Sequence, residues 1–248
     1  MVVVYRDVEM RKKQNEEKTM KKLVIIPAFN EEGNLEKTIK DIKENAPEFD
    51  YVIINDCSTD KTLEMCRKHG FSYLNLPVNL GIGGAVQTGY RYAYYHGYDV
   101  AVQFDGDGQH SAVYLNDMAS ILKKTGSDMV IGSRFIEKEG FQSSGLRRIG
   151  IKYFTHLIRL LTGKKITDPT SGMRMINRKL LEKFTDEYPK DYPEPESVVT
   201  VLCEKYNVTE IPVMMNERQE GVSSISLRNG IYYMIKVSFA ILIARMKK

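Results

Sequence analysis

The residues best suited to chemistry are two aspartates, Asp105 and Asp107, which follow the apolar run 100–104 and are each followed by a glycine. An apolar run that ends in this way is typical of a buried strand that delivers a pair of carboxylates to its carboxyl end. The carboxylates could hold a divalent metal between themselves and a diphosphate, and the glycines leave room for a bulky anion. Aspartate and glycine also form ordinary turns, so the pair alone does not decide between the two interpretations.

Three further motifs lie where other apolar runs end. In residues 26–32, Pro27 stops a strand by removing a backbone donor, and the backbone groups that follow could cradle a base or a ribose. In residues 54–60, the carboxylate of Asp56 could accept a hydrogen bond from the N–H of a uracil. Residues 79–85 place glycines at the start of a helix, where backbone N–H groups can approach a phosphate. Each motif taken alone is also consistent with turn and cap chemistry.

Short apolar runs alternate with amphipathic stretches in the first half of the chain. The predicted strands are residues 23–26, 51–54, 71–76, 100–104 and 129–131, and the predicted helices are residues 31–45, 61–69, 83–96 and 112–124. Strands that alternate with helices through short connections predict an α/β fold with a doubly wound, mostly parallel sheet. The four motifs would then meet at the carboxyl edge of that sheet.

The alternation is less regular after about residue 132. Helices are predicted at residues 145–163, 177–184 and 197–206, with strands within 167–175 and at 208–215. No Ser-, Gly- or Pro-rich linker divides the chain, so we expect one catalytic domain at residues 22–227. Residues 1–21 are expected to form a polar N-terminal extension rather than a signal peptide.

The terminal segment 228–248 is apolar on nearly every helical face and is interrupted by Lys236 and Arg245. It is too short for a confident spanning helix, so an interfacial helix, or one that docks on a small membrane subunit, fits better. A terminal helix packed on the core is the alternative. The net charge of +4, without a compact basic block and interleaved aromatic residues, does not favour nucleic-acid binding. Three cysteines without metal-site spacing favour a reducing cytoplasm.

The four motifs "PAFNEE", "NDCSTD", "NLGIGGA" and "DGDGQH", in this order and at these spacings, resemble the family 2 glycosyltransferases of the GT-A fold, which is Rossmann-like. The resemblance covers about residues 22–220. Within the family the chain looks most like the dolichyl-phosphate mannose and undecaprenyl-phosphate sugar synthases. The supporting stretches are "IGSRF" (131–135), "TDPTSGMRMINRKLL" (167–181) and "NERQEGVSSIS" (216–226).

The resemblance implies a role for each matching position. The residues that would line the nucleotide are Pro27, Ala28, Glu31 and Gly83, with Asp56 holding the base. Asp105 would face the ribose, the donor sugar or the metal, and Asp107 with Gln109 would bind Mg²⁺ or Mn²⁺ and the diphosphate. A cationic cluster for the phosphates would comprise Arg134, Arg147 or Arg148, and Arg218.

Two positions depart from the family's pattern. Cys57 stands where the family often has glycine, so the turn after Asp56 must tolerate a side chain. The run 224–226 lacks the lysine that such synthases often carry, which puts one phosphate contact in doubt.

These observations and the resemblance predict transfer of a hexosyl group from a nucleotide sugar, for which we expect a UDP-sugar, to a polyprenyl phosphate. The resemblance implies inversion at the anomeric carbon. The acceptor phosphate is largely ionised at neutral pH and would need no general base. Transfer to a sugar hydroxyl in cell-envelope polysaccharide synthesis is the alternative, and it needs a carboxylate base, for which the candidates are Asp168, Glu194 and Glu196. A non-catalytic nucleotide-sugar-binding subunit is the third interpretation. We expect a cytoplasmic protein, peripheral on the inner face of the membrane, and leave homo-oligomerisation open.

Overall fold

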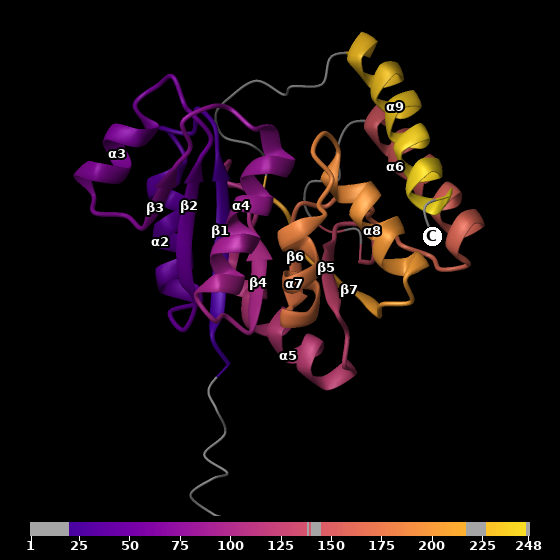
Figure 1. Ribbon diagram of the computed structural model, residues 1–248, viewed down its shortest axis with the longest axis horizontal. Coiled ribbons are helices and arrows are strands. Elements are labelled where there is room, and N and C mark those ends of the chain that lie inside the picture. The colour runs from indigo at the N-terminus through magenta and orange to yellow at the C-terminus, as the bar shows by residue number, and fades with distance from the viewer. Residues whose placement is uncertain (1–19, 138, 140–144, 217–226, 247–248) are drawn as a thin grey trace, which may run out of the picture.

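The computed structural model describes residues 20–137, 139, 145–216 and 227–246, without the side chains of residues 146, 147 and 227–233 (Figure 1). Arg218 and the run 217–226 lie outside the described residues.

A seven-stranded sheet forms the centre of the molecule, in the order β3-β2-β1-β4-β6-β5-β7. Its strands are β1 (Lys22–Ala28), β2 (Asp50–Asn55), β3 (Tyr73–Asn75), β4 (Val100–Gln103), β5 (Met129–Ser133), β6 (Arg174–Asn177) and β7 (Val208–Pro212). Strand β6 is antiparallel to both of its neighbours, and the other pairs are parallel. The predicted α/β fold with a mostly parallel sheet is confirmed. The chain runs outward from β1 to β3 and then returns to place β4 on the other side of β1, which creates a switch point where such sheets bind ligands.

Helices cover both faces of the sheet. They are α2 (Leu35–Asn45), α3 (Thr62–Lys68), α4 (Gly81–Tyr95), α5 (Leu115–Thr125), α6 (Gly145–Thr162), α7 (Arg178–Asp186), α8 (Pro193–Cys203) and α9 (Leu227–Met246), with a 3₁₀ turn at Ala112–Tyr114. One buried cluster joins the sheet to α4 and α6 to α9, and a second joins it to α2, α3 and α5. Alternate side chains of each strand point to opposite faces, so both faces of these apolar strands are covered.

The first helix begins later than predicted, at Leu35 rather than at residue 31. The cause is Asn30, whose backbone lies in the left-handed region with φ 59° and whose side chain accepts hydrogen bonds from the chain after β2. Residues 29–33 therefore form a loop beside the carboxyl end of β1 rather than a helical turn.

The C-terminal helix α9 packs against α6 and α8 at the edge of the molecule (Figure 1). Val237, Ile241 and Ala244 are buried in the same cluster as the sheet, whereas Phe239 and Met246 on the other side are exposed. The buried side agrees with the alternative of a terminal helix packed on the core, and interfacial binding by the other side stays a prediction. Among the described residues, no helix is both long and apolar enough to cross a membrane.

Helix α4 lies unusually close to β1 at Gly89. A Cβ atom added there would overlap Cγ2 of Ile25 in the middle of the sheet. We expect Gly89→Ala to lower the free energy of unfolding by about 1–3 kcal/mol, because overpacking forces the helix and the strand apart. Denaturant titration would measure the change. Gly145→Ala is the control, since a Cβ atom at this helical glycine meets nothing within 4 Å and its stability should be unchanged or slightly raised. Equal stability of both variants would contradict the close packing.

Candidate active site

An open cleft of about 460 Å³ lies at the carboxyl ends of β1, β2 and β4. It is lined by Pro27, Ala28, Phe29, Glu31, Asp56, Asn79, Gly81, Ile82, Asp105, Gly106, Asp107 and Glu194. Seven of the predicted site residues are thereby brought together from segments far apart in the sequence. The described lining contains five acidic side chains and neither a lysine nor an arginine. A diphosphate entering this cleft would therefore need a cation that the described lining does not supply.

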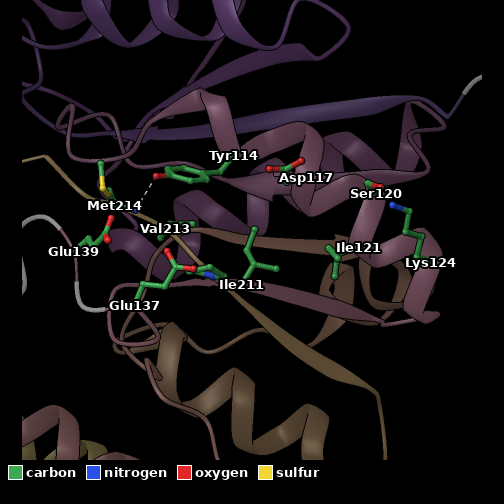
Figure 2. Close-up of a pocket in the computed structure, with 11 residues that line it drawn as sticks. Tyr114, Asp117, Ser120, Ile121, Lys124, Glu137, Glu139, Ile211, Val213 and Met214 are labelled. Carbon is green, nitrogen blue, oxygen red and sulfur yellow. Dashed lines mark hydrogen bonds between the residues drawn. The ribbon is translucent and has the colours of Figure 1, made fainter.

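A second hollow of about 400 Å³ lies between α5 and β7 (Figure 2). Its lining includes Ile121, Ile211 and Val213, and carboxylates from Asp117 and Glu137. None of the predicted site residues contributes to it, so it is separate from the candidate site.

The loops that follow β1 and β2 hold one another in place. The side-chain carbonyl of Asn30 accepts hydrogen bonds from the backbone N–H groups of Thr59 at 2.8 Å and Asp60 at 3.3 Å. In the other direction, Ser58 Oγ accepts a hydrogen bond from the N–H of Asn30 at 3.0 Å. Thr62 Oγ1 accepts one from the N–H of Glu31 at 2.9 Å. These reciprocal bonds fix the wall of the cleft where a nucleotide is predicted.

Asp56 is buried at the end of β2, and its Oδ1 accepts a hydrogen bond from the N–H of Leu80 at 2.7 Å. The amide of Asn79 donates to the carbonyl oxygen of Asp56 at 3.1 Å. Asp56 thus anchors the loop before α4, and its contact with a base stays a prediction. Cys57, the next residue, adopts φ 57° and donates its thiol hydrogen to Pro77, so the left-handed turn does carry a side chain here.

Gly83 does not line the cleft. Its N–H donates to the carbonyl oxygen of Lys190 at 3.2 Å, and a Cβ atom there would overlap the backbone of Pro189 and Lys190. The absence of a side chain allows the loop before α8 to pack on the first turn of α4. Gly81 and Ile82 are the residues of this turn that face the cleft. The predicted contact between the glycine-rich loop and the nucleotide therefore falls to these two residues rather than to Gly83.

The carboxylate of Asp105 is held from three sides. Gln103 Nε2 donates to its Oδ1 at 3.3 Å, and His110 Nδ1 accepts the N–H of Asp105 at 3.0 Å. Since a backbone N–H can only donate, the ring hydrogen of His110 lies on Nε2, which is 3.7 Å from Oδ2 of Asp105. On the third side a Cβ atom at Gly172 would lie 2.5 Å from Oδ2. Sequence reasoning missed Gln103, His110 and Gly172, although His110 stood within the "DGDGQH" motif.

Asp107 is buried at the start of the next turn, and its Oδ1 accepts the N–H of Gln109 at 3.1 Å. Gln109 lies outside the cleft lining and exchanges backbone and side-chain contacts with Asn216, at 2.9 and 3.5 Å. No group of three or more His, Cys, Asp or Glu side chains able to hold a metal occurs in the described part of the chain. Two carboxylates with hard oxygen donors still fit Mg²⁺ or Mn²⁺, which complete their coordination with waters and substrate phosphates.

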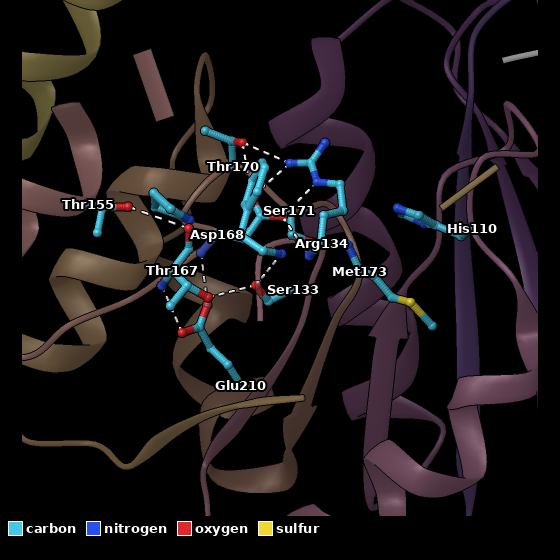
Figure 3. Close-up of polar contacts among 12 residues, drawn as sticks. His110, Ser133, Arg134, Thr155, Thr167, Asp168, Thr170, Ser171, Met173 and Glu210 are labelled. Atoms are coloured by element: carbon cyan, nitrogen blue, oxygen red, sulfur yellow. Dashed lines mark hydrogen bonds and ion pairs between the residues drawn. The ribbon is translucent and has the colours of Figure 1, made fainter. Parts of the chain in front are cut away.

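Arg134 is buried away from the cleft in an ion pair with Asp168 (Figure 3). Its Nε and Nη2 donate to the two carboxylate oxygens at 2.6 and 2.7 Å, and Nη2 also reaches Thr170 Oγ1 at 3.1 Å. Asp168 is fully buried and further fixed by its N–H, which donates to Glu210 at 2.9 Å. A bidentate pair of this kind occupies both groups. We predicted that Arg134 binds a phosphate and that Asp168 could act as a general base. The positions of the two side chains do not support either role, and both stay predictions.

The other predicted arginines are not brought together by the described residues. Arg148 is exposed on α6 and does not line the cleft. The side chain of Arg147 and all of Arg218 lie outside the described residues, so the predicted cationic cluster is not tested.

Glu194, in the first turn of α8, faces Asp105 across the cleft. Gln103 Nε2 bridges the two carboxylates, at 3.3 Å from Asp105 and 3.4 Å from Glu194. Burial raises the pKa of the Glu194 carboxyl, the positive charge of Arg174 opposes that rise, and the negative charge of Asp105 adds to it. Glu196 points elsewhere, since it is not part of the lining. Of the three candidate bases, Glu194 alone lies in the cleft.

Arg174 on β6 supports this arrangement from beneath and was not predicted. Its side chain is 1% exposed, and the acceptors of its guanidinium within the described part of the chain are neutral oxygens. The acceptors are the carbonyls of Ser171, Pro169 and Glu194 and the hydroxyl of Ser197.

A doubly wound sheet with a crevice at its switch point is the architecture of α/β proteins that bind nucleotides. The chain belongs to glycosyl transferase family 2, whose model matches residues 23–185. The predicted family is confirmed, and the chain is a glycosyltransferase that uses a nucleotide sugar.

Two relatives and one solved structure illustrate the family. The polyprenol monophosphomannose synthase of Mycolicibacterium smegmatis is 28% identical over 89% of this chain and 86% of its own length. The UDP-N-acetylglucosamine–dolichyl-phosphate N-acetylglucosaminyltransferase of Methanococcus voltae is 27% identical over 91% of this chain and 96% of its own. The fold is similar to glucosyl-3-phosphoglycerate synthase from Mycobacterium tuberculosis, in complex with Mn²⁺, UDP and glucosyl-3-phosphoglycerate. That match has a TM-score of 0.70 and 18% identity, over 92% of this chain and 80% of the other.

The seat of Asp105 can be tested at Gly172. Gly172→Ala would push the carboxylate out of place, so we expect kcat/KM for transfer to fall by about a hundredfold with a smaller effect on stability. Steady-state transfer assays and thermal melts on the same preparation would separate the two effects. Gly150→Ala is the control, because a Cβ atom there makes only an ordinary contact with Met234. Unchanged kcat/KM in the Gly172 variant would contradict the proposed seat.

The raised pKa of Glu194 makes a prediction for stability. At pH values just above 4.5, the ordinary pKa of the group, the Glu194 carboxyl is still protonated in the folded protein but has lost its proton in the unfolded chain. The free energy of unfolding of the parent therefore falls as the pH rises through this range. Gln cannot ionise. We therefore expect Glu194→Gln to gain stability relative to the parent as the pH rises from about 4 to about 7, measured by denaturant titration. Glu64→Gln on the exposed side of α3 is the control. A difference that is constant with pH, or that falls, would refute the assignment.

Proposed function

We propose that this glycosyltransferase moves a hexosyl group from a UDP-linked sugar to a polyprenyl phosphate, with inversion at the anomeric carbon. The observation that carries the proposal is the convergence of Asp56, Asp105 and Asp107 on one cleft at the switch point. The activities of the two relatives, as their names give them, support a polyprenyl or dolichyl phosphate acceptor. Their sugars differ, so the hexose itself is not part of the proposal.

The donor would lie with its base against Asp56 and the loop after β1. Pro27, Ala28 and Glu31 line this part of the cleft, and Phe29 offers an exposed ring beside them. The second carboxylate oxygen of Asp56 would accept a uracil N–H, since Oδ1 is already bound to Leu80. The UDP in the M. tuberculosis synthase structure supports the choice of a uridine donor.

The charge of the cleft supports metal dependence. An anionic diphosphate beside five carboxyl groups is repelled unless a cation lies between them. Asp107 would hold Mg²⁺ or Mn²⁺, with Asp105 and Gln109 as the further candidate ligands. The metal would neutralise the charge that develops on the departing diphosphate. The Mn²⁺ in the M. tuberculosis synthase structure supports this assignment.

The transfer step needs no proton movement in the protein. An ionised oxygen of the acceptor phosphate forms a bond to the anomeric carbon on the face opposite the diphosphate. The bond from that carbon to the donor's β-phosphate oxygen breaks, and the nucleoside diphosphate leaves with the electron pair. Asp105, fixed by Gln103, His110 and Gly172, would orient the donor sugar or ribose. Arg134, Arg148 and Arg218 remain candidates for the acceptor's phosphate.

We further propose a cytoplasmic protein that binds peripherally to the inner face of the membrane through α9. A lipid acceptor requires such contact, and the outer side of α9 carries exposed apolar residues, which supports it. A small membrane subunit is the alternative partner for the same side.

A sugar hydroxyl is the alternative acceptor, and Glu194 is the observation that favours it. A carboxyl whose pKa is raised by burial, facing Asp105 across the donor cleft, has the character of a general base. A hydroxyl acceptor would deliver its proton to Glu194 as its oxygen attacks.

The two acceptors can be separated with one panel. The protein is incubated with Mg²⁺ or Mn²⁺ and UDP- or GDP-sugars, with and without undecaprenyl phosphate, and released nucleoside diphosphate and glycolipid are measured. We expect release that depends on the lipid phosphate, is abolished in Asp107→Asn, and changes only a few-fold in Glu194→Gln. Removal of a general base would instead cost about 10²–10⁴-fold.

Asp117→Asn on α5 is the matched control for Asp107→Asn, because Asp117 lies in the second hollow and should leave the rate unchanged. Transfer only to a glycan acceptor, with loss in Glu194→Gln or Glu196→Gln, would establish the alternative. Full activity of Asp107→Asn would remove the metal assignment.

A further inference from the structure

Helix α9 presents an apolar row to solvent. Phe239 is 62% exposed and Met246 is 85% exposed. The exposed row comprises Ile235, Phe239, Leu242, Ile243 and Met246. Their spacing of three and four residues places them on one side of the helix, opposite the buried row that joins the core. The exposed row is therefore not a by-product of core packing.

Helix α6 carries two rows that run side by side. The apolar row is formed by Ile149, Tyr153 and Leu160, of which Leu160 is 82% exposed. Each of these residues follows an exposed cation in the sequence, so a parallel cationic row is formed by Arg148, Lys152 and Arg159. Equal spacing along the helix keeps the two rows adjacent over three turns.

The two helices are neighbours with their outer rows on the same surface. Tyr153 Oη and Ser238 Oγ are 3.0 Å apart, and a Cβ atom at Gly150 would lie 3.8 Å from Sδ of Met234. Figure 1 shows α9 and α6 side by side at the edge of the molecule, remote from α3. The apolar row of α6 lies on the side that faces α9, so the two apolar rows form one band with the cations of α6 along its border.

The net positive charge of the chain comes from these two helices. Together α6 and α9 contain seven Lys and Arg residues and no Asp or Glu. The remaining residues carry 29 Lys and Arg against 32 Asp and Glu. The net positive charge of the whole protein thus arises from two helices that also expose apolar rows, and Lys164 and Lys165 extend the cationic border beyond α6.

We propose that α6 and α9 together form one surface that binds an anionic lipid bilayer, with α6 contributing the cations and both helices the apolar contact. Exposed apolar rows bordered by cations bind at the headgroup boundary, where lipid phosphates meet acyl chains. The inference rests on the proposed lipid acceptor and adds α6 to the proposed membrane surface.

The same charges disfavour a second copy of the chain as the occupant. A symmetric dimer through this face would bring each cationic row against its own counterpart, because a twofold interface pairs the same patch on both subunits. Like charges without intervening acids oppose such contact. A bilayer with anionic headgroups instead supplies the complementary charge.

Vesicle co-sedimentation of the full chain tests the surface without any sugar substrate. We expect binding to vesicles of phosphatidylcholine mixed with phosphatidylglycerol, and much weaker binding to phosphatidylcholine alone. The triple variant Lys152→Gln, Arg159→Gln, Lys164→Gln should bind on the order of a hundredfold more weakly, since each cation near an anionic surface contributes about a fivefold factor. Phe239→Asn with Ile243→Asn should also weaken binding.

The matched charge control is Lys61→Gln, Arg67→Gln, Lys68→Gln, three exposed cations around α3 at the other end of the sheet. It should bind like the parent. Equal losses in the two triple variants would reduce the effect to net charge and overturn the proposal. Lipid-free self-association that Phe239→Asn abolishes would identify a second copy as the occupant and overturn it as well.

Nucleoside diphosphate release with a short, water-soluble prenyl phosphate separates this proposal from the proposed function. The triple variant Lys152→Gln, Arg159→Gln, Lys164→Gln should keep that activity while losing vesicle binding. If the parent itself shows no such activity, the proposed acceptor fails, and the vesicle result still decides the surface.

Discussion

The arrangement of the cleft depends on a buried cation that lines none of it. Arg174 lies on the one antiparallel strand of the sheet, and its guanidinium ties the loop before β6 to the first turn of α8. That loop leads into Gly172, against which Asp105 rests, and that turn carries Glu194. A guanidinium enclosed by neutral oxygens has a fixed fork geometry, so both segments are set by one group. Removing it would leave several buried carbonyls unpaired and would free both walls of the cleft at once.

The donor side of the cleft is fixed by a different principle. There the loops after β1 and β2 exchange backbone and side-chain hydrogen bonds through Asn30, and Asp56 binds the loop that precedes α4. Each of these contacts lies between segments that follow neighbouring parallel strands. The two sides meet at the switch point between β1 and β4, where Asp105 belongs to both, because β4 delivers it and the segment before β6 supports it.

The sequence predicts those features that depend on neighbours along the chain. Apolar runs located the strands, and the polar residues after them located the cleft, because the carboxyl ends of parallel strands share one edge. The sequence does not show which side chains contact each other when they are far apart along the chain. Nothing adjacent to Arg134 indicates that it pairs with Asp168, and nothing near Gly83 indicates that a loop more than a hundred residues away covers it. The sequence places Gln103 within a buried strand. Only the fold shows that its side-chain amide donates hydrogen bonds to the carboxylates of Asp105 and Glu194.

The cleft is acidic and the outer helices are basic, and both charges suit the phosphate groups that each is proposed to bind. A cleft with five acidic side chains can accept a diphosphate only together with a bound cation. A surface that carries its own basic side chains beside exposed apolar rows attracts lipid phosphates without an added metal ion. Helix α9 shares a buried cluster with α8, whose first turn carries Glu194 at the cleft. A bilayer bound along α6 and α9 would therefore lie at a fixed orientation to Asp105 and Asp107. The lipid phosphate would then be brought to the donor by the rigid core, without a mobile linker between membrane and active site.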